Sequence, residues 1–273
     1  MGVLGVINRI ITKKRIIPIP RPINMEKQLT GRVAMITGGN SGIGYSIAQT
    51  FLINDATVII VGRNTEKLKD AVDSLSKISS KVDSVELDLT NVEEIQRIVK
   101  SAWEKYGKID ILVNSAGMHH TESFGAISEQ QYDDIMATNV KGVFFLSQEI
   151  SNRMIKNNVK GNILNVSSSS GVRAAWGPYQ MSKWALNGLT KGLADKLLPY
   201  DIIVNAVAPG QTATPMLNAS SEDIYNPNVI GERYILPTEI AQVALFLVSD
   251  FGRIIVGDTV YASVGSGIVN SHG

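Results

Sequence analysis

The sequence contains no cysteine, and this absence removes several kinds of chemistry at once. Disulfide bonds, thiolate catalysis and zinc sites built on cysteine are excluded. Histidine is also scarce, since the chain has only His119, His120 and His272. So few histidines argue against a metal cage rich in this residue. We therefore predict a protein with no metal site.

An excess of charge of one sign and long apolar runs are lacking too. Lys and Arg number 26 against 25 Asp and Glu, a formal net charge of +1. The whole molecule therefore offers no strong field for nucleic acid. No apolar run approaches the ~20 residues needed to span a bilayer, and the first residues lack the pattern of a secretory signal. We expect a cytoplasmic protein with no nucleic-acid partner.

Residues 1–24 form a basic N-terminal extension that carries five Lys and Arg residues and no acid. Its apolar residues are followed by Pro18, Pro20 and Pro22. One interpretation is a short amphipathic helix that contacts a membrane surface or a partner. The interpretation we favour is that translation starts at Met25, or that the extension packs on the domain.

From residue 32 onward, short β-branched runs alternate with longer stretches of helical periodicity. The predicted strands are residues 32–37, 57–61, 82–87, 109–113, 162–166, 202–207 and 256–261. The predicted helices are residues 43–53, 66–78, 92–106, 129–157, 179–198 and 238–248. The strands are nearly continuous apolar runs, which is typical of parallel strands buried on both faces. The alternation predicts an α/β fold: a single Rossmann-like domain with a doubly wound, seven-stranded parallel sheet and helices on both faces.

No repeat, linker or break divides the chain after the extension. We expect residues 25–273 to form a single dinucleotide-binding catalytic domain. Residues 211–236 are a long stretch rich in Ser, Asn and Pro. Long segments of this kind are often lids or binding loops, so this one is the predicted substrate loop.

A glycine-rich loop follows the first predicted strand and leads directly into a helix. It reads Thr37-Gly38-Gly39-Asn40-Ser41-Gly42-Ile43-Gly44. Glycines allow a tight turn and a close approach to a pyrophosphate, and the helix start adds free N–H groups and the positive end of the helix dipole. The position between a strand and a helix in the first βα unit supports a dinucleotide site, although the spacing differs from the usual GxGxxG.

This loop resembles the cofactor loop of the short-chain dehydrogenase/reductase family in its single-domain form, and five further motifs resemble that family in the expected order. They are Asp88-Leu89, Asn114-Ser115-Ala116-Gly117, Asn139, Tyr179-Gln180-Met181-Ser182-Lys183 and Pro209-Gly210-Gln211-Thr212-Ala213-Thr214. The resemblance spans about residues 30–265. It implies that the cofactor contacts Gly38, Asn40, Ser41, Gly42, Ile43, Gly44, Arg63, Asn64, Asp88, Leu89, Asn114, Ala116, Gly117, Tyr179, Lys183, Pro209, Gly210, Thr212 and Thr214. It also implies a homo-oligomer, a tetramer or a dimer, built on the helices of residues 129–157 and 179–198.

The end of the second strand favours NADP(H) over NAD(H). Folds that prefer NAD place an acid there to bind the ribose 2′-hydroxyl, whereas this chain has Gly62 followed by Arg63. A guanidinium can bind a 2′-phosphate through its planar, permanently charged fork. The alternative is that Arg63 is a solvated surface charge and the enzyme takes both cofactors.

The resemblance implies a catalytic group of Asn139, Ser168, Tyr179 and Lys183. Tyr179 and Lys183 are four residues apart, so they share one helix face. In the implied scheme Tyr179 is the general acid/base, and the Lys183 ammonium lowers its pKa and holds the nicotinamide ribose. Ser168 would hydrogen-bond the substrate oxygen, and Asn139 would hold a water that passes protons to Lys183.

The catalytic serine is ambiguous, because Ser167, Ser168 and Ser169 are consecutive. Alignment on the strand end favours Ser168, which precedes Tyr179 by eleven residues where relatives usually have about thirteen. The expected substrate contacts come from residues 118–124, 172–176 and 211–236, and they suggest a medium-sized, partly apolar substrate.

The predicted function is an NADP(H)-dependent oxidoreductase that transfers a hydride between nicotinamide and a small alcohol or carbonyl compound, with ketone reduction the favoured direction. One alternative is an epimerase or dehydratase that keeps its cofactor bound. Another is a cofactor-binding regulator or scaffold without turnover. Loss of Tyr179 or Lys183 would mark such a scaffold, and both residues are present.

Overall fold

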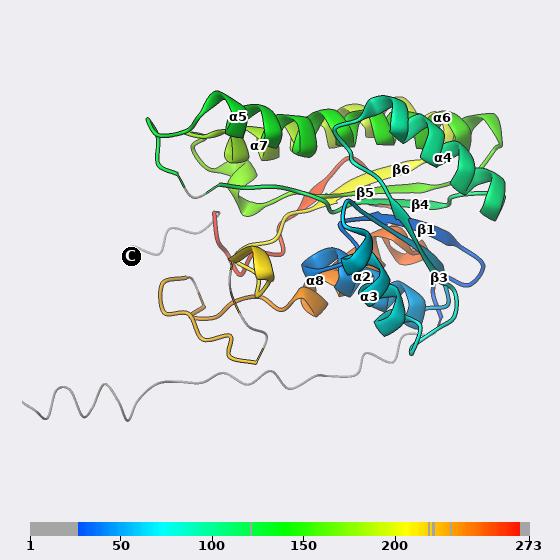
Figure 1. Cartoon of the computed structure of the whole chain (residues 1–273), viewed down its shortest axis with the longest axis horizontal. Coiled ribbons are helices and arrows are strands. Elements are labelled where there is room, and N and C mark those ends of the chain that lie inside the picture. The colour runs from blue at the N-terminus through cyan, green and yellow to red at the C-terminus, as the bar shows by residue number, and fades with distance from the viewer. Residues whose placement is uncertain (1–26, 121, 218, 220–221, 230, 268–273) are drawn as a thin grey trace, which may run out of the picture.

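The computed structural model describes residues 27–120, 122–217, 219, 222–229 and 231–267 (Figure 1). The predicted basic extension, residues 1–24, lies outside the described residues. Among the residues that are described, no helix combines the length and the apolar character needed to cross a membrane.

Seven parallel strands form one sheet, as the sequence predicts, and their order is β3-β2-β1-β4-β5-β6-β7. The strands are β1 Val33–Thr37, β2 Thr57–Gly62, β3 Val82–Glu86, β4 Ile111–Asn114, β5 Asn162–Val166, β6 Ile203–Val207 and β7 Thr259–Val260. Every residue of β1, β4, β5 and β6 is buried. The edge strand β3 is only partly buried, since its Asp83 and Glu86 are polar residues that a two-sided core would exclude.

Helices cover both faces of the sheet (Figure 1). On one face lie α4 Val92–Tyr106, α5 Glu129–Met136, α6 Val143–Lys156 and α7 Pro178–Leu197, and on the other lie α2 Gly42–Ile53, α3 Thr65–Leu75 and α8 Pro237–Val248. Successive side chains of one strand point to opposite faces, so Ile59 joins the core under α4 and α6 while Ile60 joins the core under α2 and α8. The sheet is therefore doubly wound.

The single helix predicted over residues 129–157 is interrupted. A Ser128–Gln131 capping box starts α5, and a π-helical turn, Ala137–Gly142, separates α5 from α6. A Cβ atom on Gly142 would lie 2.5 Å from the Leu89 carbonyl oxygen, so the turn packs directly on the loop after β3. Residue periodicity cannot reveal such a turn, because the hydrophobic pattern continues through it.

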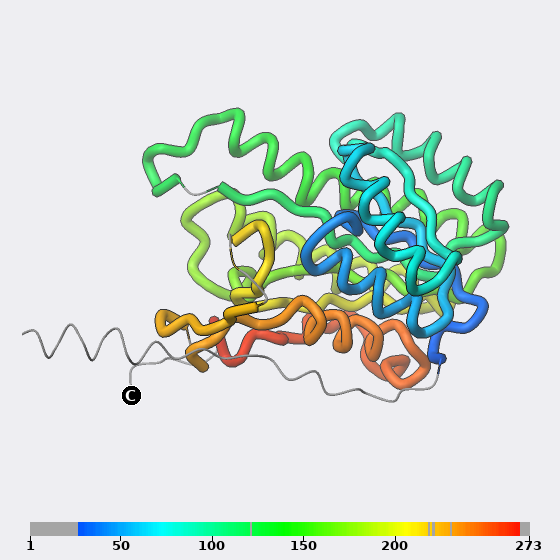
Figure 2. The backbone as a smooth tube through the Cα atoms, turned by 60° about the horizontal axis from the view of Figure 1, so that its bottom comes forward, coloured from blue at the N-terminus to red at the C-terminus, as the bar shows by residue number. Residues whose placement is uncertain are grey.

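The strand order reverses between β1 and β4, which are neighbours in the sheet. The loops after these two strands run to opposite faces, and a crevice opens at their carboxyl ends, as is general for doubly wound sheets. The described residues of the predicted substrate loop, 211–217, 219, 222–229 and 231–236, lie at the same end of the molecule as the segment before α5 (Figures 1 and 2). Two irregular segments therefore lie beside the crevice.

Candidate active site

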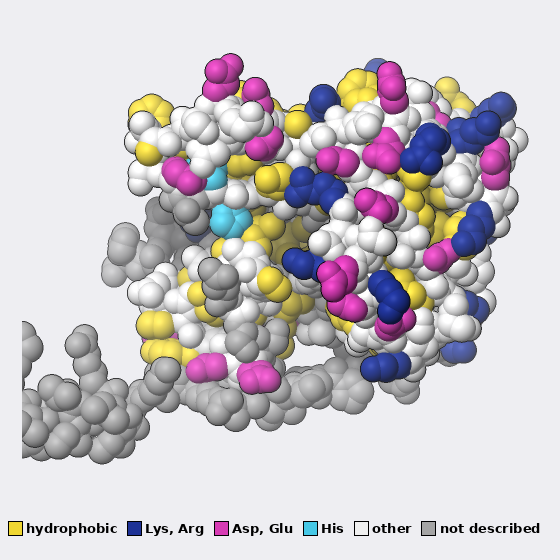
Figure 3. Space-filling model, in the orientation of Figure 1, with side chains coloured by type: hydrophobic (Ala, Val, Ile, Leu, Met, Phe, Trp, Pro, Cys, Tyr) yellow, Lys and Arg dark blue, Asp and Glu magenta, His cyan; other side chains and the backbone are white. Residues whose placement is uncertain are grey.

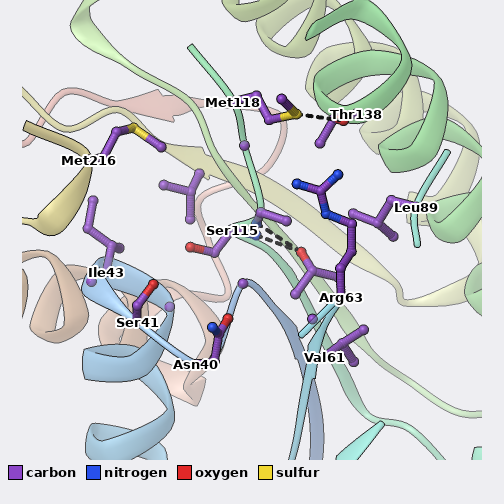
Figure 4. Close-up of a pocket in the computed structure, with 18 of the residues that line it drawn as sticks. Asn40, Ser41, Ile43, Val61, Arg63, Leu89, Ser115, Met118, Thr138 and Met216 are labelled. Carbon is purple, nitrogen blue, oxygen red and sulfur yellow. Dashed lines mark hydrogen bonds between the residues drawn. The ribbon is translucent and has the colours of Figure 1, made fainter. Parts of the chain in front are cut away.

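A cavity of about 390 Å³ opens at the carboxyl ends of the strands (Figure 4). Its lining includes fifteen of the residues predicted to bind a cofactor: Gly38, Asn40, Ser41, Gly42, Ile43, Gly44, Arg63, Asn64, Asp88, Leu89, Ala116, Gly117, Tyr179, Lys183 and Thr214. These residues come from segments spread over most of the chain. The fold thus brings the glycine loop and the predicted catalytic pair to one hollow.

The glycine loop is packed too closely to tolerate side chains. A Cβ atom on Gly44 would lie 2.3 Å from the Gly38 carbonyl oxygen, and one on Gly38 would lie 3.0 Å from the Ala116 nitrogen. Gly42 has φ 55°, a left-handed conformation that L side chains rarely adopt. The Ser41 side chain makes no cap hydrogen bond, so the first N–H groups of α2 stay available to a ligand. The loop fits the pyrophosphate of a dinucleotide.

Thr37 joins the two loops at the switch point. Its Oγ1 accepts hydrogen bonds from the Ser115 and Ala116 nitrogens, each at 3.0 Å (Figure 4). This contact ties the end of β1 to the loop after β4 and so shapes the cavity floor. Thr37 is not among the predicted site residues, although its position directly before the first glycine of the loop is a sequence signal for this contact.

Two cations stand at the end of the cavity formed by β2 and α3. Arg63 follows β2 and points into the cavity in Figure 4, and Lys67 lies on the first turn of α3. Both side chains are exposed, and neither has an ion pair among the described residues. Asn64 Oδ1 accepts a hydrogen bond from the Lys67 nitrogen at 2.8 Å, which caps α3 and sets where Lys67 emerges. The sequence analysis missed Lys67.

Four predicted cofactor residues lie outside the cavity lining: Asn114, Pro209, Gly210 and Thr212. Asn114 Nδ2 donates to Ser147 Oγ at 3.0 Å and to Asn165 Oδ1 at 2.9 Å, in a buried polar chain between strands and helices. The Thr212 hydroxyl donates to the Gly210 carbonyl at 3.1 Å. These side chains are used within the protein, so they can position the cavity wall rather than reach into it.

Tyr179 and Lys183 lie on the first turns of α7, which Gly177 and Pro178 start. Lys183 Nζ lies 5.6 Å from the centre of the Tyr179 ring and donates to the Val166 carbonyl at 3.0 Å. Burial lowers the pKa of Lys183 to about 8. Burial also raises the pKa of Tyr179, and its hydrogen bond with the Ser168 side chain opposes that rise. Burial, rather than the Lys183 charge, therefore dominates the pKa of Tyr179 in the protein alone.

The three candidate serines have different surroundings. Ser167 Oγ donates to Asn187 Oδ1 at 2.6 Å, and Ser169 is buried in the short helix Ser169–Val172. Ser168 is the serine whose side chain lowers the pKa of Tyr179 through a hydrogen bond, and its Oγ also accepts from the Ser170 nitrogen at 3.1 Å. Ser167 lines the cavity whereas Ser168 does not, so Ser168 as the catalytic serine stays a prediction.

Asn139 sits in the π-helical turn and is fully buried. Its Oδ1 accepts from the Met118 nitrogen at 2.8 Å, and its Nδ2 donates to the Met118 carbonyl at 2.9 Å and to Ser182 Oγ at 3.1 Å. One side chain thus ties the loop after β4 to α7. Because both amide hydrogens are used, a water at Asn139 would have to be held by its oxygen atoms.

The matched family is the short chain dehydrogenase, whose model covers residues 32–224. The chain is 34% identical to a 3-oxoacyl-[acyl-carrier-protein] reductase FabG of Aquifex aeolicus (strain VF5), over 88% of this chain and 99% of that protein. It is also 34% identical to an acetoacetyl-CoA reductase of Acinetobacter sp. (strain RA3849), over 84% of this chain and 95% of that protein.

The chain is a short-chain dehydrogenase/reductase. Two solved structures agree with this fold. An actinorhodin polyketide ketoreductase with NADPH has a TM-score of 0.81 at 28% identity and covers 90% of this chain and 100% of that one. A 3-ketoacyl-(acyl-carrier-protein) reductase from Brucella melitensis complexed with NADH has a TM-score of 0.80 at 28% identity, covering 88% and 100%. The chain is therefore an oxidoreductase whose relatives bind nicotinamide cofactors.

The segments predicted to contact substrate in this short-chain dehydrogenase/reductase differ in whether their side chains contact the catalytic pair. The His119 ring meets the Tyr179 ring edge-on with centroids 6.1 Å apart, and its Nε2 is 2.9 Å from the Met216 carbonyl oxygen. Arg173 instead donates to Ser266 Oγ at 2.6 Å, while Val172 and Trp176 are exposed. Met118 and Met216 line the cavity and complete its wall, which the sequence showed only as members of predicted loops.

Proposed function

We propose that this short-chain dehydrogenase/reductase is an NADP(H)-dependent reductase of ketones. The observation that carries the proposal is the pair of Tyr179 and buried Lys183, with Ser168 acting on the Tyr179 phenol, in the same cavity as the glycine loop. The similarity to two ketone-reducing relatives and to a ketoreductase structure supports the same reaction.

The preference for NADP(H) is supported by charge at the end of β2. Gly62 stands where an NAD enzyme would carry an acid, so no carboxylate at that position repels a 2′-phosphate. Arg63 and Lys67 both face this end of the cavity, and a phosphate there would be met by two cations. Asp88 follows the next strand, β3. Its Oδ1 accepts hydrogen bonds from the Thr90 nitrogen and the Thr90 hydroxyl, each at 2.9 Å, so that oxygen is already engaged within the loop.

A nicotinamide cofactor held by the glycine loop and Lys183 would supply the hydride for the carbonyl carbon. Tyr179 donates its phenolic proton to the carbonyl oxygen as negative charge develops there, and Ser168 donates a hydrogen bond to the same oxygen. Lys183, whose pKa is about 8, is mostly an ammonium at neutral pH and stabilises the phenolate that Tyr179 leaves behind. Asn139 holds Met118 and Ser182 in place around this group.

We also propose a homo-oligomer of two or four subunits. Large apolar side chains are exposed on the helices that the sequence predicts for assembly, namely Tyr132, Phe144, Met181 and Trp184. A second set of exposed apolar residues lies on the last turn of α8 and in the segment after it, namely Phe246, Phe251, Ile254 and Val256. Patches of this kind on separate faces are typical of subunit interfaces. The expected cytoplasmic location and single catalytic domain over residues 25–273 stay predictions.

The test is a spectrophotometric assay of the purified full chain with NADPH or NADH and a panel of neutral ketones, keto acids and acyl thioesters. Ketone-dependent oxidation of NADPH, faster than with NADH, is the expected result. NADPH binding without turnover of any ketone would favour the alternative, a cofactor-binding regulator or scaffold. Faster turnover with NADH would contradict the assignment of Arg63.

A further inference from the structure

A second cavity, of about 310 Å³, adjoins the proposed reaction site and has no role in the mechanism above. Its lining is Met118, His119, His120, Glu122, Gln131, Asp134 and Ile135. Met118 lines both cavities, and His119 contacts the Tyr179 ring. The two described histidines (cyan) lie in the hollow of the face shown in Figure 3. A substrate held at Tyr179 would therefore extend into this second cavity.

His120 is a buried polar side chain in the lining of this cavity. Its side chain is only 7% exposed, and Nδ1 is 3.3 Å from Glu122 Oε2. Neither ring nitrogen of His120 has a hydrogen-bond partner among the described residues. The negative charge of Glu122 beside Nδ1 favours the neutral imidazole that carries its proton there, and in that tautomer Nε2 is an acceptor. A buried acceptor without a partner costs free energy that a ligand donor would recover.

The other polar side chains that line the cavity are His119, Gln131 and the two acids Glu122 and Asp134. Gln131 Oε1 already accepts from the Ser128 nitrogen at 2.9 Å, and Asp134 Oδ1 accepts from Gln130 Nε2 at 2.9 Å. Glu122 and Asp134 bring two carboxylates to one small cavity, and the described residues that line it include no Lys or Arg. A carboxylate or phosphate placed there would meet like charge and find no cation.

We propose that this cavity is a substrate subsite for a hydrogen-bond donor, a hydroxyl or a protonated amine, and that it disfavours anionic groups. The inference rests on the proposed ketone reduction at Tyr179 and names its substrate class: a ketone with a donor group on the arm that reaches His120. Keto acids and phosphorylated ketones are selected against. His120 recognises the arm, and Asp134 supplies the charge that rejects an anion.

The experiment compares four ketones that share one skeleton and differ in the end of one arm: hydroxymethyl, aminomethyl, methyl and carboxylate. We expect kcat/KM to be highest for the two ketones whose arm ends in a hydrogen-bond donor, lower for the methyl ketone and lowest for the carboxylate. His120→Phe should lower the hydroxymethyl-to-methyl ratio about 10-fold or more, because the buried acceptor is lost. His120→Asn, which keeps an acceptor, should restore part of the ratio. Asp134→Asn should raise the carboxylate-to-methyl ratio, and the aminomethyl arm tells whether charge adds to hydrogen bonding.

Asp133→Asn is the matched control, since Asp133 is an exposed acid on the same helix outside the cavity. An unchanged hydroxymethyl-to-methyl ratio in His120→Phe, or equal use of the carboxylate by wild type, would overturn the subsite while leaving ketone reduction intact. If no ketone is reduced, the proposed function fails, and calorimetric titration of the NADP⁺-loaded protein with the corresponding alcohols still decides the subsite. Binding of the hydroxymethyl alcohol that His120→Phe weakens supports it, and absence of binding refutes it.

Discussion

Tyr179 and Lys183 show how burial at the scale of single residues prepares a proton-transfer site. Burial disfavours the charged form of each side chain, so it lowers the pKa of Lys183 to about 8 and raises the pKa of Tyr179. A tyrosine that keeps its proton suits the reductive direction, in which it must donate that proton. The Ser168 hydroxyl is the group that opposes the rise.

Replacement of Tyr179 by phenylalanine should lower kcat for ketone reduction by a factor of about 10²–10⁴, the usual contribution of a positioned general acid. The ring and its packing are retained, so NADPH affinity should change by less than about 3-fold. Steady-state kinetics and cofactor fluorescence measure the two quantities. Tyr132→Phe, at an exposed tyrosine of α5, is the control. A Tyr179→Phe enzyme that keeps most of its turnover would contradict the assignment.

Arg63→Ala should weaken NADPH binding about 10- to 100-fold, the scale of a lost hydrogen bond between charged groups. NADH lacks the 2′-phosphate, so its affinity should fall by less than about 3-fold. Lys69→Ala removes an exposed cation of α3 that pairs with Asp73, and it should affect neither cofactor. Equal losses for the two cofactors would mean that Arg63 contacts some other part of the dinucleotide.

The buried Lys183 ammonium should destabilise the protein without cofactor. A fall in pKa from 10.5 to about 8 means that the unfolded chain binds this proton more tightly, a cost of about 3 kcal/mol at neutral pH. The cost is full below pH 8 and disappears as pH rises from about 8 to 10.5. Lys183→Met should therefore raise Tm at pH 7, and its advantage over wild type should shrink above pH 8. Calorimetry across this range measures it, and an advantage that does not vary with pH would point to packing instead.

At the scale of elements, the β1–α2 loop is the least tolerant segment of the site. Gly44→Ala would place a Cβ atom 2.3 Å from the Gly38 carbonyl oxygen, in backbone that cannot move aside. We expect it to abolish measurable cofactor binding and to lower the free energy of unfolding by about 2 kcal/mol or more, as strained backbone sites do. Dye-monitored melting and NADPH titration test both effects.

The matched control is Gly188→Ala on α7, where an added Cβ atom has no atom within 4 Å. In a helix interior alanine is more favourable than glycine by roughly 0.5–1 kcal/mol, so this variant should be slightly stabilised. If Gly44→Ala lowers the free energy of unfolding and Gly188→Ala raises it, the loss at Gly44 is due to crowding and not to a general effect of removing glycine. Wild-type binding by the Gly44→Ala protein would show that the loop can rearrange.

At the scale of the whole molecule, the exposed apolar residues predict assembly. Met181 is 42% exposed and Phe144 is 40% exposed, on two neighbouring helices of one face. The double variant Phe144→Glu/Met181→Glu should shift the molecular mass in solution toward the monomer, because a charge at an apolar interface core is costly. Ile53→Glu, at an apolar residue of α2 that is 59% exposed, is the control. Light scattering after gel filtration measures the mass, and an unchanged oligomer would place the interface elsewhere.

Sequence by itself determined the fold class of this molecule and the family to which it belongs, and it predicted most of the residues that line the candidate site. Apolar runs, helical periodicity and the glycine loop depend on residues close together in the chain, so the order of strands and helices and residues such as Gly38, Gly44, Tyr179 and Lys183 were predictable. Tertiary structure decided what depends on contacts between distant segments. It decided that Asn114 faces a buried network, that Ser168 rather than Ser167 meets Tyr179, and that a π-helical turn brings Asn139 to Met118. It also brought His120 and Asp134 to one cavity, because the path of the backbone between the loop after β4 and α5 is irregular and has no periodic pattern that sequence could reveal.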